Sequence, residues 1–133
     1  MFFLGVAYDT PLRIDAGPLS RIDRDMIHIT DSQTCIDGNF SIMSFTPSGS
    51  MRPTIDYRHN ALILESKYYN IGVGDIISFN VDDLPIPIMH RVVKVSYDDD
   101  GWYVRTKGDN NVFKDTYLIR GDDINGVATM IIY

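Results

Sequence analysis

The stretch from Ser48 to Thr54, Ser-Gly-Ser-Met-Arg-Pro-Thr, carries hydroxyl groups that could act as nucleophiles. A serine hydroxyl attacks a carbonyl poorly at neutral pH unless a nearby base takes its proton. Alone, the stretch is typical of a surface turn, because Ser-Gly and Pro are common in turns. Two later features supply what it lacks: His90, and the run Thr106 to Asn111 followed by Asp115. Together these segments contain a candidate nucleophile, a base and carboxylates.

The base has three candidates, because the chain contains three histidines. His28 alternates with apolar residues in a predicted strand, and His59 lies in a polar loop, so we expect structural or solvated roles for both. His90 lies within an apolar strand pattern, where a histidine is more often a hydrogen-bonded core residue than a catalyst. It becomes the preferred base if a carboxylate reaches and orients its ring.

A hairpin predicted at residues 98–101 brings carboxylates towards His90, since Asp-Gly at its end is a strong hairpin signal. If these four residues form the loop, Tyr97 pairs with Trp102, and Asp109 lies opposite His90. A tighter two-residue turn at Asp100-Gly101 places Asn111, the second asparagine of the Gly-Asp-Asn-Asn run, opposite His90 instead. Both registers predict contact between this run and the histidine, although the run is also typical of a simple turn.

Short apolar, β-branched runs separated by Gly, Pro, Asn and Asp dominate the chain, which is typical of an all-β fold. The predicted strands are residues 1–7, 26–30, 40–45, 61–65, 76–81, 86–97, 102–107 and 125–133. Residues 18–25 are a weak helical candidate, and residues 67–74 are predicted to form a loop. We therefore predict a mostly β fold of antiparallel sheets with little helix. At 133 residues, with no break in composition, we expect one domain over residues 1–133.

The composition is ordinary for a globular protein, with 44% hydrophobic residues, 23% charged residues and a formal net charge of −6. An acidic chain without a Lys/Arg cluster disfavours nucleic-acid binding. The single cysteine, Cys35, cannot form an internal disulfide. We expect no metal or cofactor, because no set of His, Cys, Asp and Glu has ligand spacing and no glycine pattern fits a phosphate loop. Nothing in the sequence indicates an oligomeric state.

No run approaches the ~18–20 apolar residues that span a bilayer, so we expect a soluble chain without a transmembrane segment. The apolar start, residues 1–7, is short for a signal peptide and lacks a basic beginning. We interpret it as a strand, with a peripheral membrane contact as the alternative.

Four segments resemble, in order and spacing, the sequence boxes of type I signal peptidases, especially the archaeal and endoplasmic-reticulum branch. They are Ser48 to Thr54, Gly74 to Phe79, Ile86 to Val95, and Thr106 to Asn111 with Asp115. In the third box this branch has His-Arg-Val, as here, where bacterial enzymes have Lys-Arg-Val. The resemblance covers about residues 44–133, and residues 1–43 carry no match. It implies the β catalytic core that signal peptidases share with LexA-type repressors.

The resemblance also implies roles for individual residues. Ser50 would be the nucleophile, His90 the general base and Asp115 the carboxylate that orients it. The backbone N–H of Ser50 and the hydroxyl of Ser48 would form an oxyanion hole. The resemblance implies supporting roles for Asp109, Met51 and Pro53. In this family the substrate is a peptide or preprotein that binds extended along a strand edge, with small residues at positions −1 and −3.

The sequence departs from this family in one respect, and two alternative functions remain open. Members of this branch carry an N-terminal transmembrane anchor, which this sequence does not show; we expect membrane association if the protein is a true signal peptidase. The first alternative is a self-cleaving protein of LexA type, with Ala16-Gly17 as the cleaved bond. Those proteins use a lysine base, and the Pro18 that follows weakens extended binding there. The second alternative is a non-enzymatic binding module on the same fold.

Overall fold

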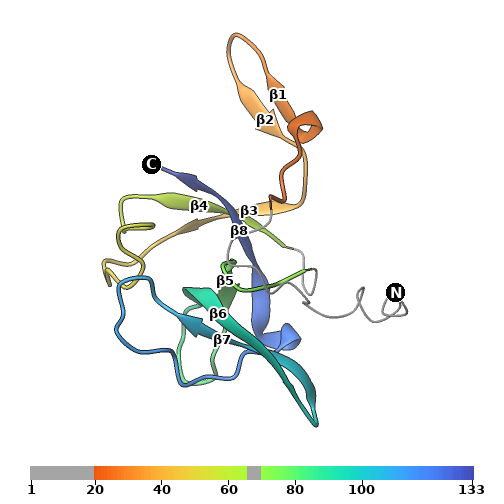
Figure 1. The fold of residues 1–133 in the computed structure, drawn as a ribbon. Helices are drawn as coiled ribbons and strands as arrows, with labels where there is room; N and C mark the ends of the chain where they lie inside the picture. The colour runs from red at the N-terminus through yellow and green to blue at the C-terminus, as the bar shows by residue number, and fades with distance from the viewer. Residues whose placement is uncertain (1–19, 66–69) are drawn as a thin grey trace, which may run out of the picture.

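The computed structural model describes residues 20–65 and 70–133, which form a mostly β structure, as predicted (Figure 1). The strands are β1 (Ile27–Ile29), β2 (Thr34–Ile36), β3 (Phe40–Ser44), β4 (Asn60–Leu64), β5 (Ile76–Phe79), β6 (Ile88–Asp98), β7 (Gly101–Lys107) and β8 (Ile124–Ile132). Two single-turn 3₁₀ helices, η1 (Arg24–Met26) and η2 (Gly121–Asp123), precede β1 and β8. No helix within the described ranges is long and apolar enough to cross a membrane.

The predicted strands that lie in the described ranges coincide closely with observed ones, apart from small differences at their ends. Strand β6 begins at Ile88 rather than at residue 86. Pro85 and Pro87 lack the N–H groups that a strand ladder requires. Strand β2 was not predicted, because three residues are too few to show an alternating pattern. The described part of the helical candidate 18–25 contains only the start of η1. The predicted strand 1–7 and the bond Ala16-Gly17 lie outside the described residues.

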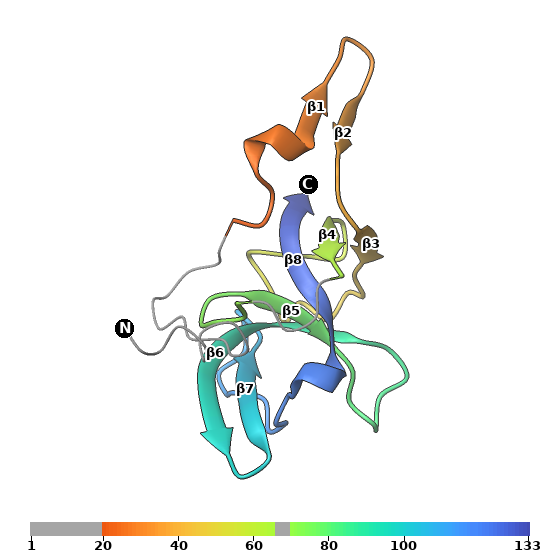
Figure 2. The same cartoon turned by 90° about the vertical axis from the view of Figure 1, so that its right-hand side faces the viewer.

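Six strands form one antiparallel sheet in the order β3-β4-β8-β5-β6-β7. Strands β1 and β2 form a separate hairpin that projects away from this sheet (Figures 1 and 2). The long strand β8 pairs with β4 through one part of its length and with β5 through another, and both pairings contain a register irregularity. Such bulges bend and twist strands. The sheet is therefore coiled rather than flat, as Figure 2 shows.

Two clusters of buried side chains fill this coiled sheet. One lies around β5, β6, β7 and β8 and contains Ile71, Ile77, Phe79, Val92, Val104, Ile119, Ile124 and Val127. The other contains Met51, Ile55, Ala61, Ile63, Ile76 and Met89. Met51 and Ile55 belong to the connection between β3 and β4 rather than to a strand. Their burial fixes the Ser-Gly-Ser-Met segment onto the sheet.

The β6–β7 hairpin has the predicted register at its turn, where Tyr97 pairs with Trp102. Further from the turn the register shifts between Val92 and Lys94, and the pairing ends at Arg91 with Lys107. The prediction that Asp109 or Asn111 lies opposite His90 is therefore wrong. A bulge inserts an extra residue into one strand, and an expectation of unbroken pairing cannot include it.

Candidate active site

The Ser-Gly-Ser-Met segment forms a tight turn held by buried neighbours. Gly49 has a φ of 72°, in the left-handed region that glycine adopts without strain. The N–H of Ile55 donates to the carbonyl of Met51 at 3.0 Å, and both side chains are buried. Ser50 immediately precedes this anchored turn. Its hydroxyl lies 3.3 Å from that of Ser48, and its backbone N–H donates to the Ser48 oxygen at 3.4 Å.

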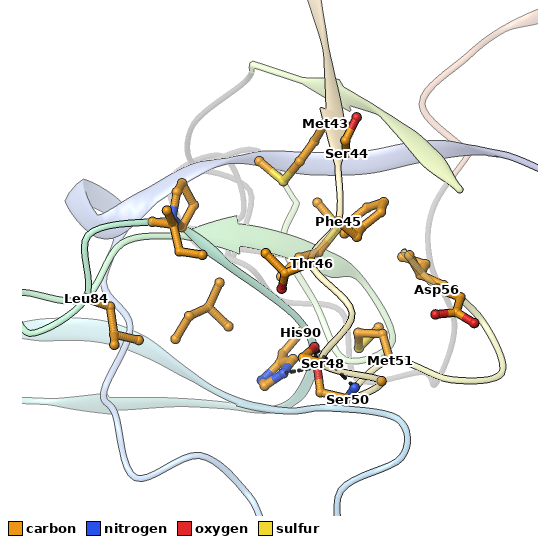
Figure 3. A pocket seen from close by; sticks show the side chains of 16 residues that line it. Met43, Ser44, Phe45, Thr46, Ser48, Ser50, Met51, Asp56, Leu84 and His90 are labelled. Carbon is orange, nitrogen blue, oxygen red and sulfur yellow. Dashed lines mark hydrogen bonds between the residues drawn. The ribbon is translucent and has the colours of Figure 1, made fainter. Parts of the chain in front are cut away.

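His90 lies near the start of β6, where it pairs with Ile77 of β5. The residue is 8% exposed, so its ring is shielded from most solvent contact. Its Nε2 lies 3.1 Å from Ser50 Oγ, and its Nδ1 lies 2.6 Å from a carboxylate oxygen of Asp115 (Figure 3 shows the Ser50 side). The hairpin pairing predicted Asp109 or Asn111 beside this histidine, whereas the family resemblance implied Asp115. The residue that contacts Nδ1 is Asp115.

Asp115 is held in place by Thr106, a buried residue of β7. The Asp115 N–H donates to the Thr106 carbonyl at 2.8 Å, and the Thr106 hydroxyl donates to the same carboxylate oxygen that contacts His90, at 2.7 Å. Burial raises the pKa of the Asp115 carboxyl. Hydrogen bonds from His90 and Thr106 lower it, with help from nearby positive charge, so the net pKa lies below its usual value. The carboxylate is therefore ionised at neutral pH and fixed beside the ring.

Asp109 contacts a different set of residues. Its two oxygens accept hydrogen bonds from Nε and Nη2 of Arg91, each at 2.8 Å, and one also accepts from the Thr54 hydroxyl at 2.6 Å. Arg91 follows His90 in β6, and successive side chains of a strand point to opposite faces. The Arg91 Nη1 also donates to the Gly74 carbonyl at 2.7 Å. Asp109 thus links three parts of the site: the turn of residues 48–54 (the serine turn), strand β6, and the loop that follows β7 (residues 108–115).

We predict that the ion pair between Arg91 and Asp109 makes the free energy of unfolding depend on pH in the acid range. Burial raises the pKa of Asp109, but hydrogen bonds from Arg91 and Thr54 bring it below the usual value. A carboxyl whose pKa is lower in the folded chain stabilises it fully above the unfolded value of ~3.9 and loses that contribution as pH falls through the folded value. Asp109→Asn should lower the free energy of unfolding by about 1–3 kcal/mol at pH 7. Urea unfolding across the acid range should show this difference shrinking.

The control is Asp99→Asn, in the exposed turn between β6 and β7, which should leave the urea midpoint nearly unchanged at each pH. An Asp109→Asn deficit that stayed constant from neutral to strongly acid pH would contradict the ion-pair explanation.

The loop after β7 also packs directly on the serine turn. The Asn110 N–H donates to the Ser50 carbonyl at 2.8 Å, and its side-chain amide donates to the Gly49 carbonyl at 3.1 Å. A Cβ on Gly108 would lie 2.6 Å from the Ser50 carbonyl oxygen, so a larger residue would push this loop away. Apart from the register that placed Asn111 opposite His90, the asparagines were predicted only as turn residues, and Gly108 and Thr106 were given no role. Their positions within the recognised boxes were the available signal.

The other two histidines have structural partners. His28 lies on the projecting hairpin, with its Nε2 2.8 Å from the exposed Asp37 carboxylate. His59 accepts the N–H of Asp56 at Nδ1, at 3.1 Å, and packs edge-on against the Tyr133 ring at 4.6 Å between centroids. Both contacts agree with the expected structural or solvated roles.

A cavity of about 550 Å³ opens beside Ser50 and His90 (Figure 3). Its lining combines the end of β3 and the serine turn with the segment that enters β6: Met43, Ser44, Phe45, Thr46, Ser48, Gly49, Ser50, Met51, Ile55, Asp56, Leu84, Ile86, Pro87, Ile88, Met89 and His90. Most of these side chains are apolar. Within residues 20–65 and 70–133, no group of three or more His, Cys, Asp and Glu residues is arranged to hold a metal ion.

The chain is similar to catalytic subunits of signal peptidase complexes. It is 34% identical over 89 residues to "Signal peptidase complex catalytic subunit SEC11" of Yarrowia lipolytica, covering 61% of this chain and 51% of that protein. It is 36% identical over 86 residues to the sec11 subunit of Schizosaccharomyces pombe, covering 57% of this chain and 46% of the relative. With the subunit of Dictyostelium discoideum the identity is 40% over 72 residues, covering 53% and 40%.

The chain spans about half the length of the curated relatives that it matches. No protein-family model matches it. These similarities agree with the resemblance noted in the sequence boxes. The chain is thus similar to the catalytic subunits of signal peptidase complexes, over about half the length of each of these relatives.

Proposed function

We propose that this protein is a serine endopeptidase of the signal peptidase type, with Ser50 as nucleophile, His90 as general base and Asp115 as its orienting carboxylate. The observation that carries the proposal is the hydrogen-bonded series from Ser50 Oγ to His90 Nε2 at 3.1 Å and from His90 Nδ1 to Asp115 at 2.6 Å. A nucleophile, a base and a group that orients the base are the three components of hydroxyl activation.

In the proposed acylation step, Ser50 Oγ attacks the scissile carbonyl as His90 Nε2 takes the hydroxyl proton. Asp115 stabilises the positive charge that develops on the imidazole ring. The proton then passes from Nε2 to the amine of the leaving segment, the C–N bond breaks, and the upstream segment stays as an ester on Ser50. Water repeats the sequence on the ester with the same base, which releases the upstream acid and restores the serine.

The tetrahedral intermediate places a negative charge on the former carbonyl oxygen, which needs hydrogen-bond donors. We assign that role to the Ser50 N–H and the Ser48 hydroxyl. The N–H donates to Ser48 Oγ at 3.4 Å, a long contact that an oxyanion can replace. The Ser48 hydroxyl can rotate towards the oxyanion when substrate is bound, because hydroxyl hydrogens turn freely.

We predict that Ser48→Ala lowers kcat by about 10²–10³, the usual effect of removing one oxyanion donor. The value of KM should change little, because the donor acts on charge that exists only in the transition state. Steady-state kinetics on a peptide substrate measures both quantities. Ser48→Thr, which keeps a hydroxyl, is the matched control and should retain much more activity; equal losses in the two variants would contradict the assignment.

The cavity supports an extended peptide as substrate. Strand β3 is an edge of the six-stranded sheet, and its continuation through Phe45 and Thr46 lines one side of the cavity. The segment from Leu84 to Met89 lines another part. A peptide lying between them can form backbone hydrogen bonds while its alternate side chains enter the apolar space. We propose preproteins with small residues at −1 and −3 as the substrate class, and action beside a membrane, as the resemblance of the sequence boxes implies. The names of the relatives, catalytic subunits of a complex, support action together with partner subunits.

The test is cleavage of a purified preprotein and of its isolated cleavage-region peptide, with products identified by mass. We expect a single cut after a small residue, and labelling of Ser50 by a fluorophosphonate that is absent in Ser50→Ala. Absence of both product and label would support the non-enzymatic binding module instead. Loss of an N-terminal fragment from the protein itself, at a rate independent of its concentration, would support self-cleavage.

A further inference from the structure

The loop that follows β7 carries two adjacent apolar side chains in solvent. Val112 is 83% exposed and Phe113 is 81% exposed. Single exposed apolar residues are common, but neighbouring large ones at a candidate active site indicate a contact surface. Neither residue lines the cavity beside Ser50.

This loop is tied to the proposed catalytic residues on both sides of the apolar pair. Asn110, on one side, donates its N–H to the Ser50 carbonyl at 2.8 Å. Asp115, on the other side, contacts His90 Nδ1 at 2.6 Å. Val112 and Phe113 therefore lie in a short connection between the serine turn and the far side of the histidine ring. Since successive Cα atoms are only about 3.8 Å apart, the pair must stay close to the Ser50–His90 contact.

The loop is not part of the cavity wall. Its lining comes from residues 43–51, 55–56, 84 and 86–90, and none of residues 108–115 contributes to it. In Figure 3 the labelled side chains of the cavity extend away from Ser50 and His90 towards Met43 and Leu84. A peptide whose upstream residues occupy this cavity must continue past Ser50 Oγ and leave over His90 Nε2, because Nε2 has to reach the leaving amine. The loop of Val112 and Phe113 is joined to Ser50 through Asn110 and lies outside the cavity lining, so it is available to a segment that leaves the cavity past Ser50.

We propose that Val112 and Phe113 contact the residues at positions +1 and +2 of the substrate, immediately after the cleaved bond, and favour apolar side chains there. This inference rests on the proposed function. Apolar contact removes both surfaces from water and so strengthens binding of the leaving segment. Because the pair forms an open surface rather than an enclosed pocket, we expect a preference of about three- to tenfold in kcat/KM, below the 10- to 200-fold range of closed apolar pockets.

The experiment uses substrates with identical upstream residues and Ala at −1, followed by either Leu-Leu or Ser-Ser at +1 and +2. Wild type should cleave the Leu-Leu substrate about three to ten times faster in kcat/KM, a modest fraction of a full apolar-pocket effect. In Val112→Ser/Phe113→Ser this ratio should fall to about 1. The methyl ester of the same upstream peptide has no +1 residue, so both enzymes should hydrolyse it equally. Ile29→Ser, at a 76% exposed position on the projecting hairpin, is the control and should keep the wild-type ratio.

The outcomes separate this inference from the function on which it rests. If wild type cleaves neither peptide nor ester, the proposed function fails and this inference fails with it. If wild type cleaves both in a Ser50-dependent manner, but the double variant keeps the Leu-Leu preference, only the inference is overturned. Reduced binding of the double variant to phosphatidylcholine vesicles, with unchanged peptide selectivity, would also overturn it and assign the pair to a lipid contact.

Discussion

Replacement of Ser50 or His90 by alanine is expected to abolish peptide cleavage, with kcat reduced about 10⁴- to 10⁶-fold in each case. The hydroxyl and its base act as one unit, because the proton that leaves Oγ must have an acceptor at Nε2, 3.1 Å away. The double variant should therefore be hardly worse than either single variant, since removing one partner already disables the other. Steady-state turnover of a peptide with small residues at −1 and −3 measures all three losses.

The comparison requires folded variants, because His90 is largely buried and its removal leaves the Asp115 carboxylate without one of its hydrogen-bond partners. Circular dichroism and the urea midpoint should show a native fold for each variant. His59→Ala is the matched control, as His59 contacts the Asp56 backbone and Tyr133 and is outside the proposed mechanism. Its activity should stay within a few-fold of wild type. Near-wild-type turnover by His90→Ala would rule out His90 as the base.

The second-largest effect is expected for Asp115→Asn, with kcat reduced about 10³- to 10⁴-fold. Asparagine has nearly the same shape, so the loop after β7 should keep its place. It lacks the negative charge that stabilises a positively charged imidazole in the transition state, and its amide can present N–H to Nδ1 where the carboxylate accepted a hydrogen bond. The loss should appear in kcat much more than in KM, because the substrate does not contact this carboxylate in the proposed mechanism.

Thr106→Val separates the charge of Asp115 from its placement. The hydroxyl of Thr106 donates to Asp115 at 2.7 Å, and its removal keeps the carboxylate but frees it to turn. Since a hydrogen bond to a charged group contributes about 1.5–3 kcal/mol, we expect a loss of at most about 10- to 150-fold in kcat. If Asp115→Asn lost no more activity than Thr106→Val, the carboxylate would be a structural residue and not part of the proposed charge stabilisation.

The class of fold and most strand positions could be predicted from the amino-acid sequence alone. Short apolar, β-branched runs bounded by turn residues are a local property, so β3 to β8 could be predicted from short windows of sequence. The residue types able to activate a serine were visible too, because few histidines compete for the role of base. In the short hairpin, strand β1 could be predicted but β2 could not, because three residues are too few to show an alternating pattern.

The carboxylate that contacts His90 depends on long-range packing of the chain. From the residues alone, hairpin pairing pointed to Asp109 or Asn111 opposite His90, while the family resemblance pointed to Asp115. One register shift near Val93 changes the pairing, so Asp109 binds Arg91 and Thr54 whereas Asp115 reaches His90. Such a bulge depends on how the whole sheet packs and leaves no periodic signal in the sequence.

The contacts that complete the site also join residues distant in the chain. Thr106 fixes the Asp115 carboxylate, and Asn110 ties the β7 loop to the carbonyl of Ser50. The cavity likewise requires the end of β3 and the entry to β6 to lie side by side. Sequence patterns describe neighbours along a strand. The distances between Ser50, His90 and Asp115 follow only from the coiled sheet that brings their separate segments together.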